Sequence, residues 1–489
     1  MSCLRRLSRG AVPRMGPEQM TTTSPLSEAL EDRVEVAASV DWSALPAETQ
    51  DATRRLVFDA LGVASAGRYA PGVDAAIGAL AGAVGPGDVQ VPWMDMSLPV
   101  TDAAMTLSWL IHAWDFDDTH DAGVLHAGAL AVAAAYATAV KESASGQRFL
   151  EGTVAGVETV ARLSLALGFQ RGVIRSSGLA CLGAAAAAAR VLGLSPLQTR
   201  SALALATPFG MSPTSRQVLV DGGETKRLQP GFGVRDGVTC AYLAKAGIRG
   251  PQGWFSGEFG LGALAQDEAA TLAALGYQGW EIDRLSIKPY PSCRFTHASI
   301  SAAFSIRSAG ITAEEIEKIE LNVPAGPSHA TVARPWARRS TPLNDRQFSI
   351  PWMVAAAITY GRADLSVVTG HSVLDAGVEA LAGRVSVRRD VVPDDSGITP
   401  VRMLVRNRDG SEQATMIRTA PGSGRHPLGW EPMTGKIAGC LRAAGLAAGR
   451  AEDTAERVGA AVRQLGKGSI TEDFVPVLAT APERAARLG

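Results

Sequence analysis

The sequence predicts a mainly helical protein that carries a smaller inserted α/β region. From about residue 27 to 276, apolar residues recur at helical spacing in stretches that Gly, Pro and Ser interrupt. From about residue 283 to 415, several segments alternate apolar and polar residues with a period of two, which is typical of strands. Helical spacing returns after residue 427. We therefore expect a large all-helical domain plus a smaller α+β domain that forms a lid.

The length of 489 residues exceeds what one hydrophobic core usually supports. In chain order we expect a disordered N-terminal extension (1–25), the helical domain (26–282), the α/β lid (283–415), a return to the helical domain (416–475) and a C-terminal tail (476–489). The extension contains Met15 and Met20, so the sequence does not decide at which methionine translation starts. A cleft between the two domains is the default binding site.

Local signals place individual helices in the first domain. A helix opens at Pro46 and runs to residue 64, and the stretches 183–192 and 198–206 read as helices separated by a Gly-Leu-Ser-Pro turn. The longest uncharged apolar runs, 127–140 and 176–189, are too short to span a bilayer, which needs about 20 residues. We expect them to be buried helices and expect no membrane association.

Three segments of the lid read as strands: 319–323, 384–388 and 400–405. A helix is expected between them at 350–360. After the lid, helices are expected at 436–444 and 451–465, where the chain rejoins the first domain.

Composition excludes several classes of function. A formal net charge of −1 argues against nucleic acid as a partner. The five cysteines are scattered without zinc spacing, which favours a reduced, cytoplasmic protein. Glycine-rich nucleotide loops, G-x-S-x-G and H-E-x-x-H are all absent from the sequence. His120 and His126 with Asp115 could bind a metal in principle, but we expect no metal and no cofactor.

The densest group of titratable residues lies between residues 112 and 126. Asp-Phe-Asp-Asp-Thr-His at 115–120 is followed by Asp121 and His126, and His112 precedes it by one helical turn, so three of the seven histidines fall here. The group stands directly before an apolar helix, where proton chemistry or anion binding could occur. A capped, solvated helix start is the alternative, and the local sequence leaves both open.

Two cationic stretches complete the candidate site. Residues 224–231 hold adjacent Lys226 and Arg227 before a Pro-Gly break, with Arg216 upstream. Residues 287–297 are stiffened by two prolines and offer Lys, Tyr, Cys, Arg and His. A nearly neutral protein needs such clusters to bind a carboxylate, although each alone could be a solvated loop. Cys293 reads as a small buried residue and not as a nucleophile.

Together these motifs resemble the MmgE/PrpD family, in the family's order from about residue 26 to 465. The matching segments are 115–120 with His126, 225–231, 288–293 with His297, and Phe-Ser-Ile-Pro at 348–351. The family includes 2-methylcitrate dehydratase, cis-aconitate decarboxylase and iminodisuccinate epimerase. The resemblance implies a helical domain with an α/β lid, a homodimer, no metal or organic cofactor, and proton abstraction next to a carboxylate.

The resemblance also assigns roles to residues. It implies that the catalytic residues are Asp115, Thr119, His126, Lys226 and Lys288. Within this set we expect the two lysines to bind substrate carboxylates, and His126 with Asp115 to move protons. Further substrate contacts are expected from Arg227, Tyr290, Arg294, Ile174 and Trp352.

Ile174 and Trp352 depart from the family pattern, because the family usually has a histidine and a tyrosine there. Gln229 and Ala127 likewise replace a histidine and a proline. Neither isoleucine nor tryptophan can exchange a proton at neutral pH, so we expect a more apolar pocket. We also expect 2-methylcitrate and cis-aconitate to be poor substrates.

The sequence therefore favours a cofactor-independent lyase that removes water or carbon dioxide from a small carboxylate. Two alternatives stay open. One is an isomerase, epimerase or cyclase of a specialised pathway that uses the same cleft. The other is a catalytically silent binding protein of the same fold.

Overall fold

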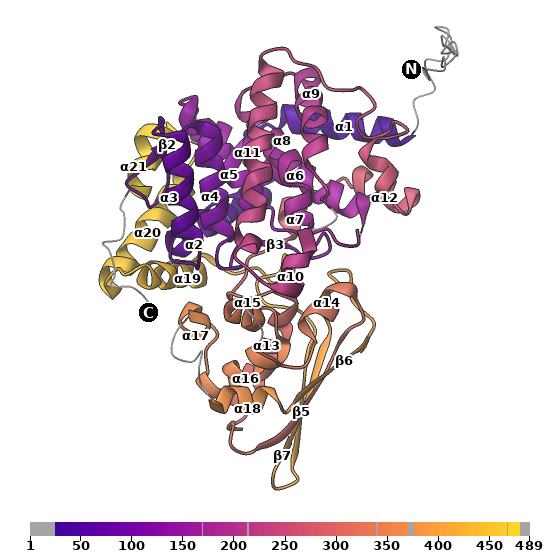
Figure 1. Cartoon of the computed structure of the whole chain (residues 1–489), viewed down its shortest axis with the longest axis vertical. Helices are drawn as coiled ribbons and strands as arrows, with labels where there is room; N and C mark the ends of the chain where they lie inside the picture. The colour runs from indigo at the N-terminus through magenta and orange to yellow at the C-terminus, as the bar shows by residue number, and fades with distance from the viewer. Residues whose placement is uncertain are drawn as a thin grey trace, which may run out of the picture.

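The computed structural model describes residues 25–479 apart from residues 169, 213–214, 339–340, 370–375 and 467. A large helical body lies above a smaller lid that holds the main sheet (Figure 1). The predicted fold class, mainly α with an α/β lid, is confirmed. Residues 1–24 of the expected extension, and residues 480–489 of the expected tail, lie outside the described residues.

The first part of the chain forms the helical body. Its helices of eight or more residues are α1 (Pro25–Ser39), α2 (Ala47–Gly67), α3 (Val73–Val84), α4 (Val100–His112), α5 (Gly128–Lys141), α6 (Gly146–Leu167), α8 (Ala180–Val191), α9 (Pro196–Ala206), α11 (Thr225–Lys245) and α12 (Glu268–Gly276). Shorter elements are α7 (Arg175–Gly178), α10 (Val218–Asp221), β1 (Val89–Gln90), β2 (Ser97–Leu98), β3 (Thr119–His120) and β4 (Leu285–Ser286). The predicted helices α2, α8 and α9 are confirmed.

Small side chains let the central helices pack closely. Helices α5 and α8 are alanine-rich and almost wholly buried, as their apolar runs predict. A Cβ atom on Gly237 of α11 would lie 2.3 Å from the carbonyl oxygen of Cys181 on α8, so only glycine fits there. This close crossing fixes α11, whose first turn carries Lys226.

Helix α11 also corrects a prediction. The Pro-Gly pair at 230–231 predicts a break in helical structure, but the helix runs through both residues. A proline inside a helix removes one backbone hydrogen bond and strains the preceding turn. Packing of α11 against α4 and α8 outweighs that cost, since Gly231 lies against Trp109 of α4 and Gly237 lies against α8.

The lid contains one four-stranded sheet with helices beside it. Its elements are α13 (His297–Ser308), β5 (Ile316–Pro324), α14 (Pro327–Val332), α15 (Pro342–Gln347), α16 (Ile350–Tyr360), α17 (Leu365–Thr369), α18 (Ala376–Ala382), β6 (Val385–Val391), β7 (Val401–Asn407) and β8 (Glu412–Ile417). The strand order is β6-β5-β7-β8, in which only β5 and β6 run parallel. The three predicted strands and the predicted helix at 350–360 are confirmed. The edge strand β8 was not predicted, because its residues are mostly exposed and lack the apolar alternation.

After the sheet the chain returns to the helical body. Helices α19 (Trp430–Ala443) and α20 (Ala448–Gln464) pack against α2, and α21 (Val475–Leu478) packs against α20 (Figure 1). Lys436 Nζ contacts Asp59 Oδ1 of α2 at 2.6 Å, which ties α19 to the first domain. Among the helices described, none has the length and apolar character that a bilayer span requires.

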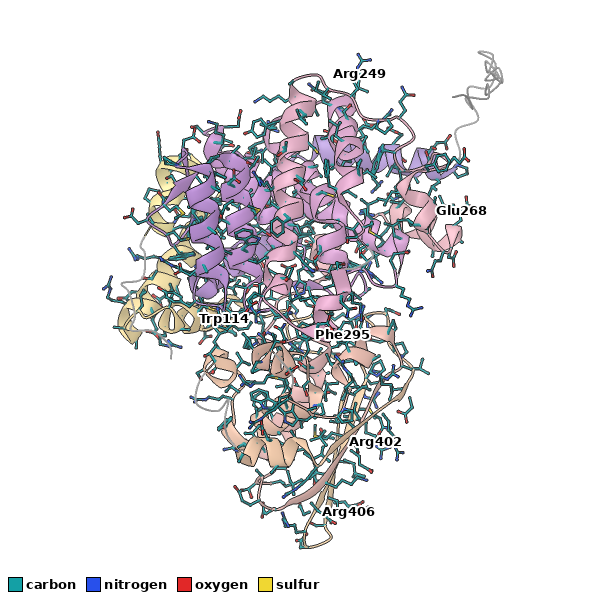
Figure 2. The ribbon with its side chains drawn as sticks, viewed as in Figure 1. Trp114, Arg249, Glu268, Phe295, Arg402 and Arg406 are labelled. Atoms are coloured by element: carbon teal, nitrogen blue, oxygen red, sulfur yellow. The ribbon has the colours of Figure 1, made fainter. Side chains whose placement is uncertain are left out.

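The two bodies meet at one level of the molecule. Trp114 and Phe295 lie at this junction, whereas Arg402 and Arg406 lie toward the far end of the lid (Figure 2). Strand β3 of the helical body pairs with β4, which directly precedes the lid, and Thr119 faces Ser286 in that pair. The acidic segment after α4 is therefore held at the junction.

Candidate functional site

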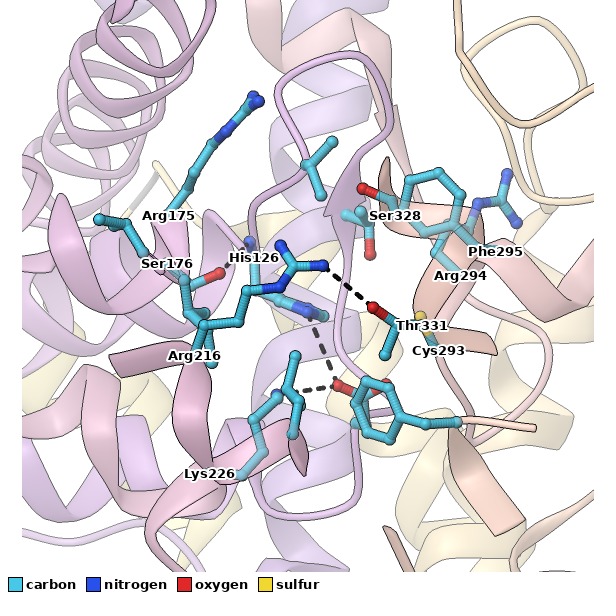
Figure 3. Close-up of a pocket in the computed structure, with 17 residues that line it drawn as sticks. His126, Arg175, Ser176, Arg216, Lys226, Cys293, Arg294, Phe295, Ser328 and Thr331 are labelled. Carbon is cyan, nitrogen blue, oxygen red and sulfur yellow. Dashed lines mark hydrogen bonds and ion pairs between the residues drawn. The ribbon is translucent and has the colours of Figure 1, made fainter. Parts of the chain in front are cut away.

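A cavity of about 100 Å³ lies between the helical body and the lid (Figure 3). Six of the ten predicted site residues line it: Asp115, Thr119, His126, Ile174, Lys226 and Arg294. Apolar side chains form much of the remaining wall: Val124, Val173, Leu219, Phe295 and Phe348. The six predicted residues thus come from four separate stretches of sequence and line one small space.

The segment after α4 turns sharply to present Asp115. The backbone φ of Asp115 is 51°, a left-handed conformation that aspartate tolerates better than most residues. Its amide donates to the carbonyl of His112 at 3.1 Å, closing a tight turn at the helix end. The carboxylate is buried as a result, and it points toward lysines from two distant parts of the chain.

Lys226 and Lys288 converge on this carboxylate. Lys226 Nζ lies 3.2 Å from Oδ1 and Lys288 Nζ lies 3.2 Å from Oδ2. Lys288 also donates to the Asp115 carbonyl at 2.7 Å and is fully buried. Burial alone would raise the pKa of Asp115, but the two ammonium charges outweigh burial and hold that pKa below its usual range.

His126 stands beside Asp115 on the cavity floor. Its Nδ1 lies 2.8 Å from the carbonyl oxygen of Asp118, and this acceptor requires the proton to be on Nδ1. Nε2 then lies 3.7 Å from Asp115 Oδ1. The His126 side chain is 15% exposed, whereas Asp117 behind it is fully buried, so of these two residues a ligand in the cavity can reach only His126.

His112 was noted in the sequence but not assigned to the site. It lies behind the floor, with Nδ1 2.9 Å from Asp117 Oδ2 and Nε2 2.6 Å from Lys226 Nζ. Burial, followed by the charge of Lys226, lowers the pKa of His112 to about 4. The feature of the sequence that points to His112 is its position three residues before Asp115, on the last turn of a helix.

The contacts of Asp118 test whether the acidic cluster is a capped, solvated helix start, which is one of its two interpretations. Its carboxylate accepts from the amides of Ala127 at 3.1 Å and Gly128 at 2.8 Å, so it caps α5. Asp118 is nevertheless 1% exposed, and burial, together with the charges of Asp117 and Asp59, raises its pKa well above the usual value. The helix start is capped, as one alternative holds, but it is not solvated.

Arg294 lines the cavity, but other groups already use its donors. Nε and Nη2 contact the two oxygens of Asp121 at 3.1 Å each, and Nη1 donates to the carbonyl of Pro421 at 2.8 Å. Nη2 also donates to Ser286 at 3.1 Å. Its guanidinium therefore braces the wall, and a substrate carboxylate would have to compete with Asp121.

Four predicted residues lie away from the cavity lining. Lys288 is behind Asp115, and Arg227 donates to Asn344 Oδ1 at 3.1 Å in a neighbouring hollow. Tyr290 packs against His297 with ring centroids 5.1 Å apart. Trp352 is fully buried in the lid near Trp336. Direct contact of these four with a ligand in the cavity is therefore not supported.

Two arginines that the sequence analysis did not assign line the cavity instead. Arg216 Nη2 donates to Thr331 Oγ1 of the lid at 3.0 Å, and both side chains line the cavity (Figure 3). Arg175 follows Ile174 and donates to the carbonyl of Gly123 at 2.7 Å. Neither is recognisable from its surroundings in the sequence, since Arg216 is separated from Thr331 by 115 residues.

Family models match most of the chain. The MmgE/PrpD N-terminal domain matches residues 32–273, and the MmgE/PrpD C-terminal domain matches residues 290–459. The chain belongs to the MmgE/PrpD family. The resemblance found in the motifs is thereby confirmed.

Three relatives illustrate the range of this family. Human cis-aconitate decarboxylase is 31% identical over 246 residues, which are 47% of this chain and 50% of that protein. The cis-aconitate decarboxylase-like protein oryM of Aspergillus oryzae is 25% identical over 415 residues, 78% of this chain and 84% of that protein. The 2-methylcitrate dehydratase of Escherichia coli O157:H7 is 23% identical over 330 residues, 64% and 67% respectively. The chain thus spans only half of the human relative's length.

A group with the ligand types of a metal site extends from the cavity floor to the residues behind it. One donor atom each from His112, Asp115, Asp117 and His126 lies within 4.8 Å of the others. The Lys226 ammonium contacts two of the four, 2.6 Å from His112 Nε2 and 3.2 Å from Asp115 Oδ1. A metal cation would have to displace or repel that ammonium.

We therefore expect purified protein to contain no stoichiometric zinc, iron or manganese. Elemental analysis by mass spectrometry measures this directly, and any activity should be unchanged after dialysis against a chelator. Lys226→Met serves as the comparison, because it removes the competing ammonium while leaving all four donor residues in place. One metal ion per chain in the unaltered protein, lost together with activity, would contradict the expectation.

Proposed function

We propose that this protein is a lyase that removes water or carbon dioxide from a small carboxylate in the cavity, without a metal or organic cofactor. The observation that carries the proposal is the cavity floor. There, His126 Nε2 and Lys226 Nζ flank one buried carboxylate, Asp115, at 3.7 and 3.2 Å. A group that can accept a proton thus lies beside a group that can bind an anion. The relatives named as decarboxylase and dehydratase support the same reaction class.

In the proposed reaction a substrate carboxylate binds to Lys226 and Arg216. His126 Nε2 then removes a proton from the neighbouring carbon, and the two cations stabilise the negative charge that develops on the carboxylate. Loss of hydroxide with that proton yields water and an alkene. In a decarboxylation the C–C bond to the leaving carboxylate breaks first, and the carbon takes a proton from an enzyme group, which solvent later replaces.

The cavity wall suggests the kind of carboxylate. The apolar side chains that face the space would bury an apolar substituent of the substrate; they belong to Val124, Val173, Ile174, Leu219 and Phe348.

We also propose a homodimer, for which the exposed Leu197, Phe209 and Phe232 of the helical body offer apolar surface. The described cysteines are free thiols, which fits the cytoplasm.

A panel of small mono-, di- and tricarboxylates in D₂O, followed by ¹H NMR, tests the function. Formation of an alkene or of carbon dioxide supports the lyase. Deuterium incorporation without loss of either group would identify an isomerase or epimerase instead. Binding without any chemical change, seen as line broadening only, would identify a silent binding protein.

Ile174→His tests whether this position limits the family reactions. Ile174 faces the cavity, and its amide is held by Ser215 Oγ at 2.8 Å, so the new imidazole should point into the same space. We expect turnover of cis-aconitate or 2-methylcitrate to rise about 10²-fold, the lower range for one general acid or base. Ile174→Met is the matched control, because it keeps an apolar side chain of similar size. Efficient turnover of either compound by the unaltered protein would contradict this prediction.

A further inference from the structure

The neighbouring hollow that holds Arg227 has a volume of about 380 Å³ and lies between the helical body and the lid. Three polar side chains in its lining are more than nine-tenths buried: Arg227, Asn344 and Arg346. Apolar or aromatic side chains form much of the remaining wall, namely Tyr69, Pro71, Trp114, Pro342, Leu343 and Val368. An apolar hollow of this size with a few buried polar groups is typical of a small-molecule site.

Arg227 leaves most of its hydrogen-bond donors unused. A guanidinium has five N–H donors, but within the part of the chain that the structure describes Arg227 makes one hydrogen bond, from Nη2 to Asn344 Oδ1 at 3.1 Å. Its Nε is buried without a partner among the same residues. Burial lowers the pKa of Arg227, and the charges of Asp115 and Glu224 offset this only in part. Since arginine stays charged at neutral pH, a buried cation with spare donors lines the hollow.

The other polar groups of the hollow favour an anion as well. Arg346 Nη1 donates to the carbonyl of Val368 at 3.2 Å, which fixes a second guanidinium in the wall. Asn344 Nδ2 donates to the carbonyl of Gly223 at 3.4 Å, so the partner of Arg227 is itself held in place. Glu224 is the acidic residue in the lining, and it is exposed to solvent. Two buried arginines therefore outweigh one solvated carboxylate.

The hollow and the cavity are built from the same chain segments. Asp115 and Lys226 line the cavity, whereas the adjacent residues Trp114 and Arg227 line the hollow. Residues 344–348 of the lid reach both spaces. A ligand in the hollow would therefore lie beside the segments that form the cavity floor.

We propose that the hollow binds a small organic carboxylate with an apolar body, and that this ligand weakens the binding of a carboxylate in the cavity. The fork of the Arg227 guanidinium matches the two oxygens of a carboxylate, and the apolar wall buries the rest of the ligand. A negative charge held at Arg227 repels a second anion at the neighbouring Lys226. The effect on turnover rests on the proposed function, whereas binding in the hollow does not.

Trp114 provides a direct test of occupancy, because it lines the hollow, while none of the described residues that line the cavity is a tryptophan. Full-length protein is labelled with 5-fluorotryptophan, and the ¹⁹F resonance of Trp114 is assigned with Trp114→Phe. Benzoate should shift this resonance saturably, and the neutral benzamide should not. In Arg227→Met the apparent Kd for benzoate should rise at least about 10-fold, the scale of a charge-assisted hydrogen bond.

Two further variants control for loss of charge and for misfolding. Arg406→Met removes an exposed cation toward the far end of the lid and should bind benzoate like the unaltered protein. Thr369→Phe keeps both arginines but fills the hollow that Thr369 lines, so it should abolish the shift even if Arg227→Met does not fold. An unchanged benzoate shift in Thr369→Phe, or no shift in the unaltered protein, would overturn the proposal. Tighter binding of inorganic phosphate than of benzoate would overturn the assignment to an apolar carboxylate.

Steady-state kinetics test the effect on the cavity. With the best carboxylate from the panel, benzoate should raise KM about 5-fold and then reach a plateau, because substrate still binds when the hollow is occupied. This effect should be lost in Arg227→Met. Competitive inhibition without a plateau, kept in Arg227→Met, would place benzoate in the cavity and overturn the coupling. If the unaltered protein turns over no carboxylate, the proposed function fails, and the Trp114 resonance still decides whether the hollow binds its ligand.

Discussion

Asp115→Asn should lower the free energy of unfolding by about 3 to 5 kcal/mol, the usual loss when one partner of a buried ion pair is removed. The neutral amide would leave two buried ammonium groups, Lys226 and Lys288, without their shared counter-charge. Lys288 is fully buried and cannot turn toward water. Urea denaturation at pH 7 measures the loss.

Two further variants separate this effect from a general sensitivity to mutation. Asp88→Asn removes an exposed partner of Lys141 and should cost no more than about 1 kcal/mol. Asp115→Asn combined with Lys288→Met removes one uncompensated charge and should regain part of the loss. Equal destabilisation by the single and the double change would mean that the shared carboxylate is not what holds the two lysines.

The same interaction gives stability a predictable dependence on pH. The pKa of Asp115 is depressed in the folded protein, so its contribution is present above the unfolded value of 3.8 and is lost as the pH falls below that value. Asp115→Asn should therefore lose less stability than the unaltered protein between pH 5 and pH 3. A parallel decline in both proteins would contradict the assigned shift.

Local patterns predicted most of the fold because they depend on neighbouring residues only. The strands β5, β6 and β7 and the helix α16 follow from alternation and from helical spacing. Strand β8 lies at the sheet edge with little buried surface, so it lacks the alternation that would reveal it. The continuation of α11 through Pro230 depends on packing against α4 and α8, which the sequence does not display.

The sequence predicts which residue types make up the candidate site, but it does not predict which side chains contact one another. Nothing near Arg294 in the sequence shows that Asp121, 173 residues away, occupies its donors. Trp352 is adjacent to a family motif, yet the fold buries it in the lid. Arg216 and His112 have roles that only the three-dimensional contacts suggest. Residue types in a motif identify the chemistry, whereas long-range contacts decide which side chain is available to perform it.

His126→Asn should reduce kcat by about 10² to 10⁴-fold, the range for loss of a general acid or base, while KM and stability change little. The asparagine amide nitrogen can replace Nδ1 as donor to the Asp118 carbonyl, so the floor keeps its support. The variant has no counterpart of Nε2, the nitrogen that faces the cavity. Steady-state kinetics on the best carboxylate from the panel, together with urea denaturation, measure both effects.

The same substitution at His120 provides the contrast. His120 is 1% exposed and its Nε2 lies 2.9 Å from Glu281, away from the cavity, so His120→Asn should lower stability while kcat stays within a few-fold. The two variants then separate a catalytic role from a structural one, because the two histidines lie only six residues apart in the sequence. If His126→Asn keeps wild-type kcat while His120→Asn loses it, the proton acceptor lies on the other side of β3, and the cavity described here is not the site of reaction.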